Sequence, residues 1–165
     1  MGCKSCANIP VWKFTNKKQL CKNCFCDYFE RKVFATIRKF NLMPKNRIFL
    51  IRKDNSVNLN VLSFVLKKKF QVKFSNKSNI DSNSLSQIAE DIFFNALNGN
   101  FNIKIKKLSP LHYLTDTEID LYAGLKNIKG KERQENRKIK ELFSKFRDKN
   151  PDLEHNIVNA FEQMR

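Results

Sequence analysis

Two closely spaced pairs of cysteines lie at the start of the chain. All five cysteines fall within the first 26 residues: Cys3 and Cys6 form one C-x-x-C pair, Cys21 and Cys24 form a second, and Cys26 follows. Each C-x-x-C turn can direct two thiolates at one metal ion, and two such turns complete a tetrahedral ligand set. The spacing therefore predicts a four-cysteine metal module, interpreted first as a structural Zn²⁺ site.

Other uses of these thiols are open to the same residues. Disulfides are disfavoured by the odd number of cysteines and by the lack of a secretory leader. A redox C-x-x-C pair needs a strand-to-helix setting, which we do not expect at either pair. An iron–sulfur cluster would use the same four ligands and is the main alternative to zinc. Cys26 is left over, and we expect it to be a small buried side chain.

Residues 1–26 are too few to form much of a core. Metal binding would supply most of their folding energy, on the order of 10 kcal/mol for zinc-finger peptides. Trp12 and Phe14 lie between the two cysteine pairs. We expect them to pack over the site as a short hairpin, and stacking on a nucleobase is the alternative. The predicted domains are a zinc-finger module at 1–26 and an α/β domain at 27–165.

The charge of the chain points to its class of partner. The 165 residues carry 32 Lys and Arg against 16 Asp and Glu, a formal net charge of +16. Residues 1–53 hold 13 basic and 2 acidic side chains, about two thirds of the net charge in the first third of the chain. Such an excess suits a polyanionic partner better than a small-molecule substrate. No run of 18 uncharged apolar residues occurs, so we expect a cytoplasmic protein without a membrane span.

Apolar periodicity predicts alternating helices and strands after the cysteines. Thr115 and Glu118 form a capping-box pattern at the start of one helix. The interleaved order predicts a parallel or mixed α/β sheet of about three strands. The expected helices are 25–40, 57–69, 83–97, 115–125, 131–146 and 152–164, and the expected strands are 47–52, 71–74 and 101–105.

The residues needed for common catalytic sites are missing. A nucleotide-binding α/β domain places a glycine-rich phosphate loop after its first strand, but residues 51–56 contain no glycine. Without glycine the backbone cannot approach a phosphate closely. The two histidines, His112 and His155, are expected to be surface or capping residues rather than general bases. The sequence offers no recognisable catalytic site.

Several motifs follow one another in the order found in one enzyme family. They are C-K-N-C-F at 21–25, R-I-F-L at 47–50, N-A-L-N-G-N at 95–100, K-K-L-S-P-L at 106–111, T-E-I-D-L-Y-A at 117–123 and N-P at 150–151. In this order the chain resembles the PP-loop tRNA 2-thiolation enzymes, the wobble-uridine thiolases of archaea and eukaryotes. The resemblance implies a Rossmann-like PP-loop domain behind an N-terminal zinc finger.

The chain departs from that family at each catalytic feature. The family's S-G-G-K-D-S loop, which binds ATP, is replaced by R-K-D-N-S at 52–56, and its acidic pair falls on Ser86 and Gln87. A deletion between about 74 and 83 removes the C-x-x-C of the catalytic iron–sulfur site, and the later cysteine and the second zinc finger are absent as well. The chain therefore resembles a truncated, non-catalytic partner subunit with a degenerate, reduced PP-loop domain.

Two functions are compatible with these features. The first is a scaffold that pairs with a catalytic PP-loop thiolase subunit, as a heterodimer or larger assembly, and helps to bind tRNA. The second is a stand-alone zinc-finger module that binds nucleic acid, and a residual ATP-using enzyme is a more distant third. The residues expected to contact RNA phosphates are Lys4, Lys13, Lys17, Lys18, Lys22, Arg31, Arg38 and Lys39.

Overall fold

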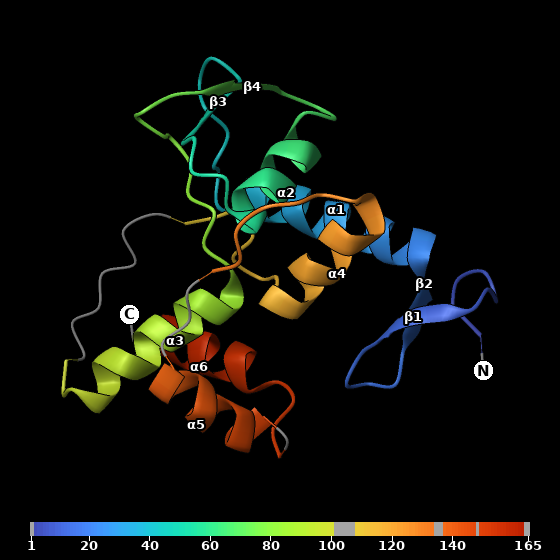
Figure 1. The fold of residues 1–165 in the computed structure, drawn as a ribbon, viewed down its shortest axis with the longest axis vertical. Helices are drawn as coiled ribbons and strands as arrows, with labels where there is room; N and C mark the ends of the chain where they lie inside the picture. Colours follow the sequence, from blue (N-terminus) through green and yellow to red (C-terminus); the bar gives the residue numbers. More distant parts are fainter. Residues whose placement is uncertain (1, 101–107, 134–136, 148, 164–165) are drawn as a thin grey trace.

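The chain forms a small α/β fold with an N-terminal hairpin at one side (Figure 1). The computed structural model describes residues 2–100, 108–133, 137–147 and 149–163. Within them the elements are β1 (Pro10–Lys13), β2 (Gln19–Cys21), α1 (Lys22–Lys39), β3 (Ile48–Ile51), α2 (Val57–Leu66), β4 (Gln71–Phe74), α3 (Leu85–Leu97), α4 (Asp116–Lys126), α5 (Arg137–Arg147) and α6 (Leu153–Gln163).

Helix α1 connects the hairpin to the rest of the protein. It begins at Lys22, three residues earlier than predicted, because Cys21 ends β2 and also serves as the helix N-cap. The expected core face is confirmed: Phe25, Phe29 and Val33 are fully buried and follow a helical repeat. The domain boundary at residue 26 stays a prediction, and α1 runs across it without a break.

A two-stranded parallel sheet lies beyond the other end of α1. Strands β3 and β4 pair in register from Ile48 opposite Gln71 to Ile51 opposite Phe74. Helix α2 connects them, as parallel pairing requires a crossover. This helix is apolar on most of its surface and is buried against the α1–α4 core. The predicted parallel α/β arrangement is therefore present, while the third strand expected at 101–105 lies outside the described residues.

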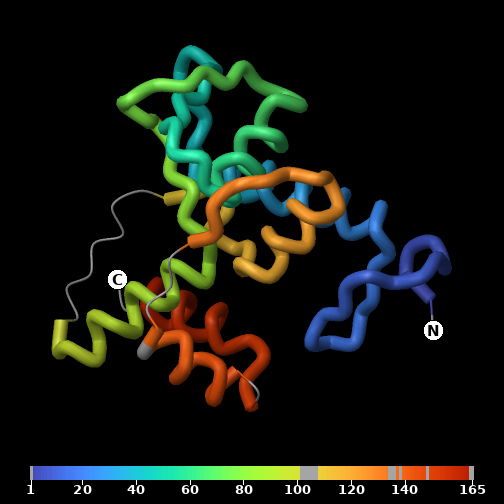
Figure 2. The backbone as a smooth tube through the Cα atoms, viewed as in Figure 1, coloured from blue at the N-terminus to red at the C-terminus, as the bar shows by residue number. Residues whose placement is uncertain are grey.

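A second core forms below the first, where α3 packs with α5 and α6 (Figures 1 and 2). Residues 131–133 are not helical and the described part of α5 is Arg137–Arg147, so the helix predicted from residue 131 starts too early. The reason is a long-range backbone pairing, because Lys131 donates its N–H to Asn55 O and accepts from Val57 N at 2.8 and 3.0 Å. Residue 131 thus belongs to an extended segment.

Helix α4 starts with the predicted capping box, in which Thr115 and Glu118 exchange side-chain-to-backbone hydrogen bonds. His112, in the turn before this helix, was expected at the surface, and that expectation is wrong. Its ring is fully buried, beside Phe40 and Tyr113. Glu162 of α6 bonds its Nε2 at 2.8 Å. His155 is half-buried. No helix among the described residues is long and apolar enough to cross a bilayer.

Candidate functional site

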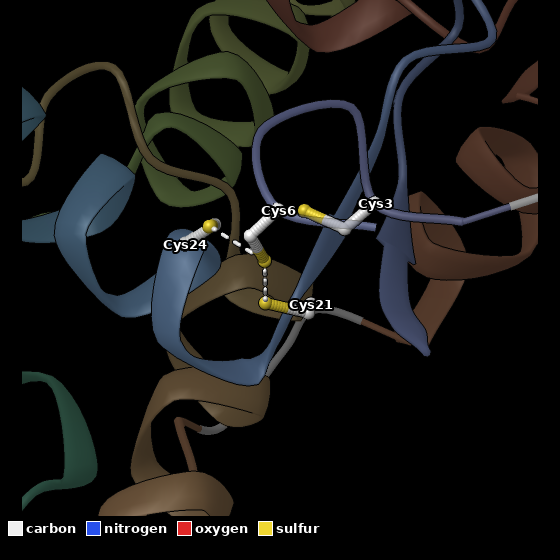
Figure 3. Close-up of side chains that lie close together, drawn as sticks. All are labelled: Cys3, Cys6, Cys21 and Cys24. Carbon is white, nitrogen blue, oxygen red and sulfur yellow. Dashed lines mark hydrogen bonds between the residues drawn. The ribbon is translucent and has the colours of Figure 1, made fainter. Parts of the chain in front are cut away.

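The four cysteines of the two C-x-x-C pairs come together in space (Figure 3). Their sulfur atoms all lie within 4.8 Å of one another. The Cys6 sulfur is 3.3 Å from that of Cys21 and 3.6 Å from that of Cys24. Four thiolates bound tetrahedrally to one ion at about 2.3 Å lie about 3.8 Å apart. The cluster therefore has the size of a site for a single metal ion.

The first pair is held by a tight turn. The N–H of Cys3 donates to Asn8 O at 2.8 Å, and the N–H of Ala7 donates to Cys3 O at 2.9 Å. Ala7 adopts a left-handed conformation, with φ of 60°, to close this turn. The turn directs both thiols of the first pair toward the second pair.

The second pair lies where β2 leads into α1. Cys21 is the last residue of the strand, and Cys24 is in the first turn of the helix. This is the strand-to-helix setting that we did not expect, so that part of the argument against a redox pair was wrong. The crowding by Cys6, which contacts both sulfurs, is the feature that favours metal binding over a two-cysteine redox pair.

Hydrogen bonds within the cluster shift the pKa values of its thiols in opposite directions. A hydrogen bond from the backbone of Cys21 lowers the pKa of Cys3 to about 6, and one from the backbone of Cys24 lowers the pKa of Cys21. Hydrogen bonding to the Cys6 and Cys21 thiols raises the pKa of Cys24 to about 12. A bound divalent cation would stabilise all four as thiolates.

Cys26 is buried as predicted, and Trp12 and Phe14 lie in the expected hairpin, whereas their packing over the cysteine site stays a prediction. Cys26 is buried, with 4% of its surface exposed. Trp12 of β1 packs on Phe25 with ring centroids 5.4 Å apart, and Phe14 meets Tyr28 edge-on at 5.0 Å. The hairpin is therefore fastened to α1 by aromatic contacts in addition to the cysteine cluster.

The eight basic residues predicted to contact RNA are all exposed. Arg31 and Arg38, seven residues apart, share the side of α1 that faces away from the core. Lys39 is held by Tyr113, whose hydroxyl lies 2.5 Å from its Nζ and whose ring centroid lies 4.6 Å away. Lys32, by contrast, is turned inward to Tyr28. RNA contact by the eight side chains remains a prediction.

The loop at 52–56 has its donors occupied by the protein itself. Asp54 accepts from the N–H of Ser56 at 2.9 Å, and Ser56 accepts from the N–H of Leu59 at 3.4 Å. The N–H of Val57, the first residue of α2, donates to Lys131 O at 3.0 Å. A helix N-terminus binds a phosphate through such N–H groups, so three of the donors that a ligand would use are taken.

The segment at 129–131 covers this loop closely. A Cβ atom on Gly130 would lie 2.7 Å from Val57 N and 3.0 Å from Asn55 O, so only glycine fits there. Lys129 O also accepts a hydrogen bond from the Asn60 side chain at 2.8 Å. Sequence reasoning missed this contact, because nothing local at 129–131 indicates a partner near residue 55.

A cleft of about 270 Å³ opens beside the start of α2. Its charged lining residues have both signs: Asp116, Asp120, Glu132, Arg133, Arg137 and Lys140. Arg133 bridges two elements there, with paired bonds to Glu90 of α3 and bonds of 3.0 and 2.8 Å to Asp116 of α4. No local sequence pattern indicates this bridge, because it joins residues that are distant along the chain.

Two known tRNA-modifying enzymes are similar to this chain, one in sequence and one in fold. No protein-family model matches the chain. Over 69 residues, 41% of the chain, it is 36% identical to the tRNA-5-methyluridine(54) 2-sulfurtransferase of Pyrococcus horikoshii, and the match spans only 22% of that protein's length. The solved structure of the U34-tRNA thiolase NcsA from Methanococcus maripaludis with its 4Fe–4S cluster superposes with a TM-score of 0.80.

That superposition covers 99% of this chain and 87% of the thiolase, with 13% identical residues, so it shows the fold. The chain is thus similar in sequence to one tRNA 2-thiolating enzyme and in fold to another. The expected α/β framework with few strands is confirmed by this match.

Proposed function

We propose that this chain is a non-catalytic subunit of a tRNA wobble-uridine 2-thiolation complex. In this role it scaffolds an active PP-loop thiolase subunit and helps to bind tRNA. The observation that carries the proposal is that protein groups occupy backbone donors where the loop at 52–56 meets α2, which the family resemblance makes the counterpart of the ATP loop, in a chain with the fold of a tRNA thiolase. The two similarities to thiolases support a role in tRNA thiolation, and the filled loop supports the lack of catalysis.

The loop at 52–56 is unsuited to ATP in three ways. It has no glycine, so its backbone cannot form a close cradle for phosphate. The Asp54 carboxylate accepts the N–H of Ser56, the residue before α2, and would repel a phosphate there. The Gly130 segment lies directly on the loop. Together these features support a chain that binds tRNA but does not activate its uridine with ATP.

The cysteine content supports the same conclusion. All five cysteines lie in residues 3–26, so none remains in the α/β part to hold a catalytic iron–sulfur cluster. In the N-terminal cluster, sulfur atoms within 4.8 Å suit one shared ion. In a cubane cluster each thiolate binds a different iron, which spreads the sulfurs farther apart. We therefore assign a structural Zn²⁺ to Cys3, Cys6, Cys21 and Cys24, and elemental analysis finding iron would overturn the assignment.

The exposed basic residues support tRNA as the polyanionic partner that the net charge predicts. The hairpin projects from one side of the molecule, and its lysines are exposed (Figure 1). Arg31 and Arg38 extend this charge along α1. Phosphate contacts of this kind release counterions, so binding should weaken steeply with salt.

A face for the partner subunit is suggested by exposed apolar side chains. Phe74 at the end of β4 is 52% exposed, and Phe94 and Leu97 of α3 are 48% and 60% exposed. Exposed apolar side chains of this size commonly mark protein contacts. Phe94 and Leu97, three residues apart on α3, are candidates for the surface on which the catalytic subunit docks.

Two binding measurements on the isolated chain test the proposal. Calorimetric titration with Mg·ATP should give no heat of binding, while an intact PP-loop thiolase serves as the positive control. Fluorescently labelled tRNA should bind at 50 mM salt and lose at least about tenfold in affinity at 200 mM. Measurable ATP binding would support a residual enzyme instead, and salt-independent tRNA affinity would contradict the phosphate contacts.

A further inference from the structure

A second cleft lies where the hairpin meets the helices, away from the loop at 52–56. Its volume is about 280 Å³, and residues from β1, α1, α4 and α6 line it. We call it the junction cleft and define it by Trp12, Phe14, Tyr28, Lys32, Thr117 and His155. Figure 2 shows the tip of the hairpin turning toward the start of α6, and Thr15 donates to Asp152 there at 3.2 Å.

Aromatic side chains form part of the cleft wall. Trp12 and Phe14 meet edge-on with centroids 6.1 Å apart, and Phe14 continues to Tyr28. The indole Nε1 of Trp12 is buried and has no hydrogen-bond partner among the described residues. This N–H lies inside the protein and is closed to an occupant of the cleft, so Trp12 contributes its ring to the wall and not its donor.

Polar groups with fixed geometry lie beside these rings. The Tyr28 hydroxyl donates to Glu118 at 2.9 Å and accepts from Lys32 Nζ at 2.7 Å. Glu118 itself is only 4% exposed, so this network is held rigidly. The cleft therefore combines aromatic faces with both a donor and an acceptor, the combination that recognises a heterocyclic base.

We propose that the junction cleft binds an unstacked nucleobase of single-stranded RNA. The inference rests on the proposed tRNA binding and adds to it a site that reads a base rather than a phosphate. Lys13 and Arg147, at the edge of the same cleft, are placed to bind the flanking phosphates. The carboxylates of Glu118 and Glu154 line the cleft and disfavour a phosphate inside it.

Other small occupants fit these residues less well. Among the described residues the four cysteines are the only His, Cys, Asp or Glu group placed to hold a metal ion, so the cleft carboxylates do not form a cation site. A purely apolar ligand would leave the Lys32–Glu118 pair without a new partner. A planar base uses both the aromatic walls and this polar pair.

Trp12 is the single tryptophan of the chain, so its fluorescence reports on this cleft. The test titrates the full metal-loaded chain with hexauridylate and with a hexamer of the same phosphates that lacks bases. Hexauridylate should change the Trp12 emission and bind about 5- to 150-fold more tightly than the abasic hexamer. Equal affinities for the two hexamers, or no change in emission, would overturn the proposal.

Paired variants separate the cleft from the rest of the surface. Phe14→Leu removes an aromatic wall and should weaken hexauridylate binding at least about fivefold, while Phe64→Leu, which is 40% exposed on α2 and lies outside the cleft, should not. His155→Ala should also weaken hexauridylate binding. Its control is Asn156→Ala, at the exposed neighbouring residue, which should not. Equal effects within both pairs would refute the base site.

The outcomes distinguish this inference from the proposed function. Salt-dependent binding of tRNA without any response of Trp12 would refute the junction cleft alone. Failure of tRNA to bind at low salt would refute RNA binding as a whole, and the base site with it.

Discussion

Gly130 gives the sharpest test of the way in which the loop at 52–56 is closed. A Cβ atom at this position would lie 2.7 Å from Val57 N, 2.9 Å from Ser56 C and 3.0 Å from Asn55 O. All three are backbone atoms, so no side chain can swing aside. Gly130→Ala must therefore push the segment at 129–131 away from the loop.

The cost follows from the hydrogen bonds across that contact. They are Val57 N–H to Lys131 O at 3.0 Å, Lys131 N–H to Asn55 O at 2.8 Å and the Asn60 amide to Lys129 O at 2.8 Å. At about 1 kcal/mol each, their loss removes about 3 kcal/mol from the free energy of unfolding. For a chain of this size that lowers Tm by roughly 6–12 °C.

Gly124 provides the matched control, because a Cβ there meets no atom within 4 Å. It lies within α4, where alanine is favoured over glycine by about 0.5–1 kcal/mol. Thermal unfolding followed by circular dichroism should show a lower Tm for Gly130→Ala and an unchanged or higher Tm for Gly124→Ala. Equal Tm values for the two variants would refute the close approach of this segment to the loop.

Three further changes test other parts of the structure. Serine at any of the four clustered cysteines should release the metal and expose the hairpin to protease, whereas Cys26→Ala should keep the metal content measured by elemental analysis. Arg133→Ala leaves the carboxylates of Glu90 and Asp116 without their partner, and urea unfolding should show a loss of about 3 kcal/mol. Burial lowers the pKa of His112 below 6.5, so the unfolded chain binds a proton that the folded chain excludes. The free energy of unfolding should therefore be greatest above about pH 7 and fall as the pH drops through 6.5, and His112→Leu should flatten this slope.

Local signals in the sequence predicted the elements that depend on local chemistry. The helical repeat of Phe25, Phe29 and Val33 identified the buried face of α1, because one face of a helix must cover the core. The capping box identified the start of α4, and the C-x-x-C spacing identified the sulfur cluster before its geometry was known.

Features that depend on distant partners could not be predicted in this way. Lys131 was predicted at the start of a helix that continues to residue 146, but its backbone pairs with the loop at residue 55. His112 was expected to be a surface or capping residue, and its burial depends on Phe40 and on Glu162 from the last helix. In both cases tertiary contacts outweigh local preference, and the sequence offers no short-range trace of them.

The apolar residues exposed on β4 and α3 lead to a related prediction about assembly. If Phe74, Phe94 and Leu97 contact a partner subunit, aspartate at Phe94 should weaken the complex while leaving Tm of the isolated chain within about 1 °C. The control variant is Leu142→Asp, because Leu142 is 36% exposed on α5 and does not belong to that set. Equal loss of complex with both variants would argue against this face.

Whether the chemistry takes place on another chain can be decided by one reconstitution. The tagged protein is co-expressed with an intact PP-loop thiolase from the same genome, purified, and analysed by size exclusion with light scattering, and then assayed for 2-thiouridine in tRNA. We expect a stoichiometric complex that thiolates tRNA, with no product from this chain alone. Thiolation by the isolated chain, or its elution apart from the thiolase both with and without tRNA, would rule out the non-catalytic partner role.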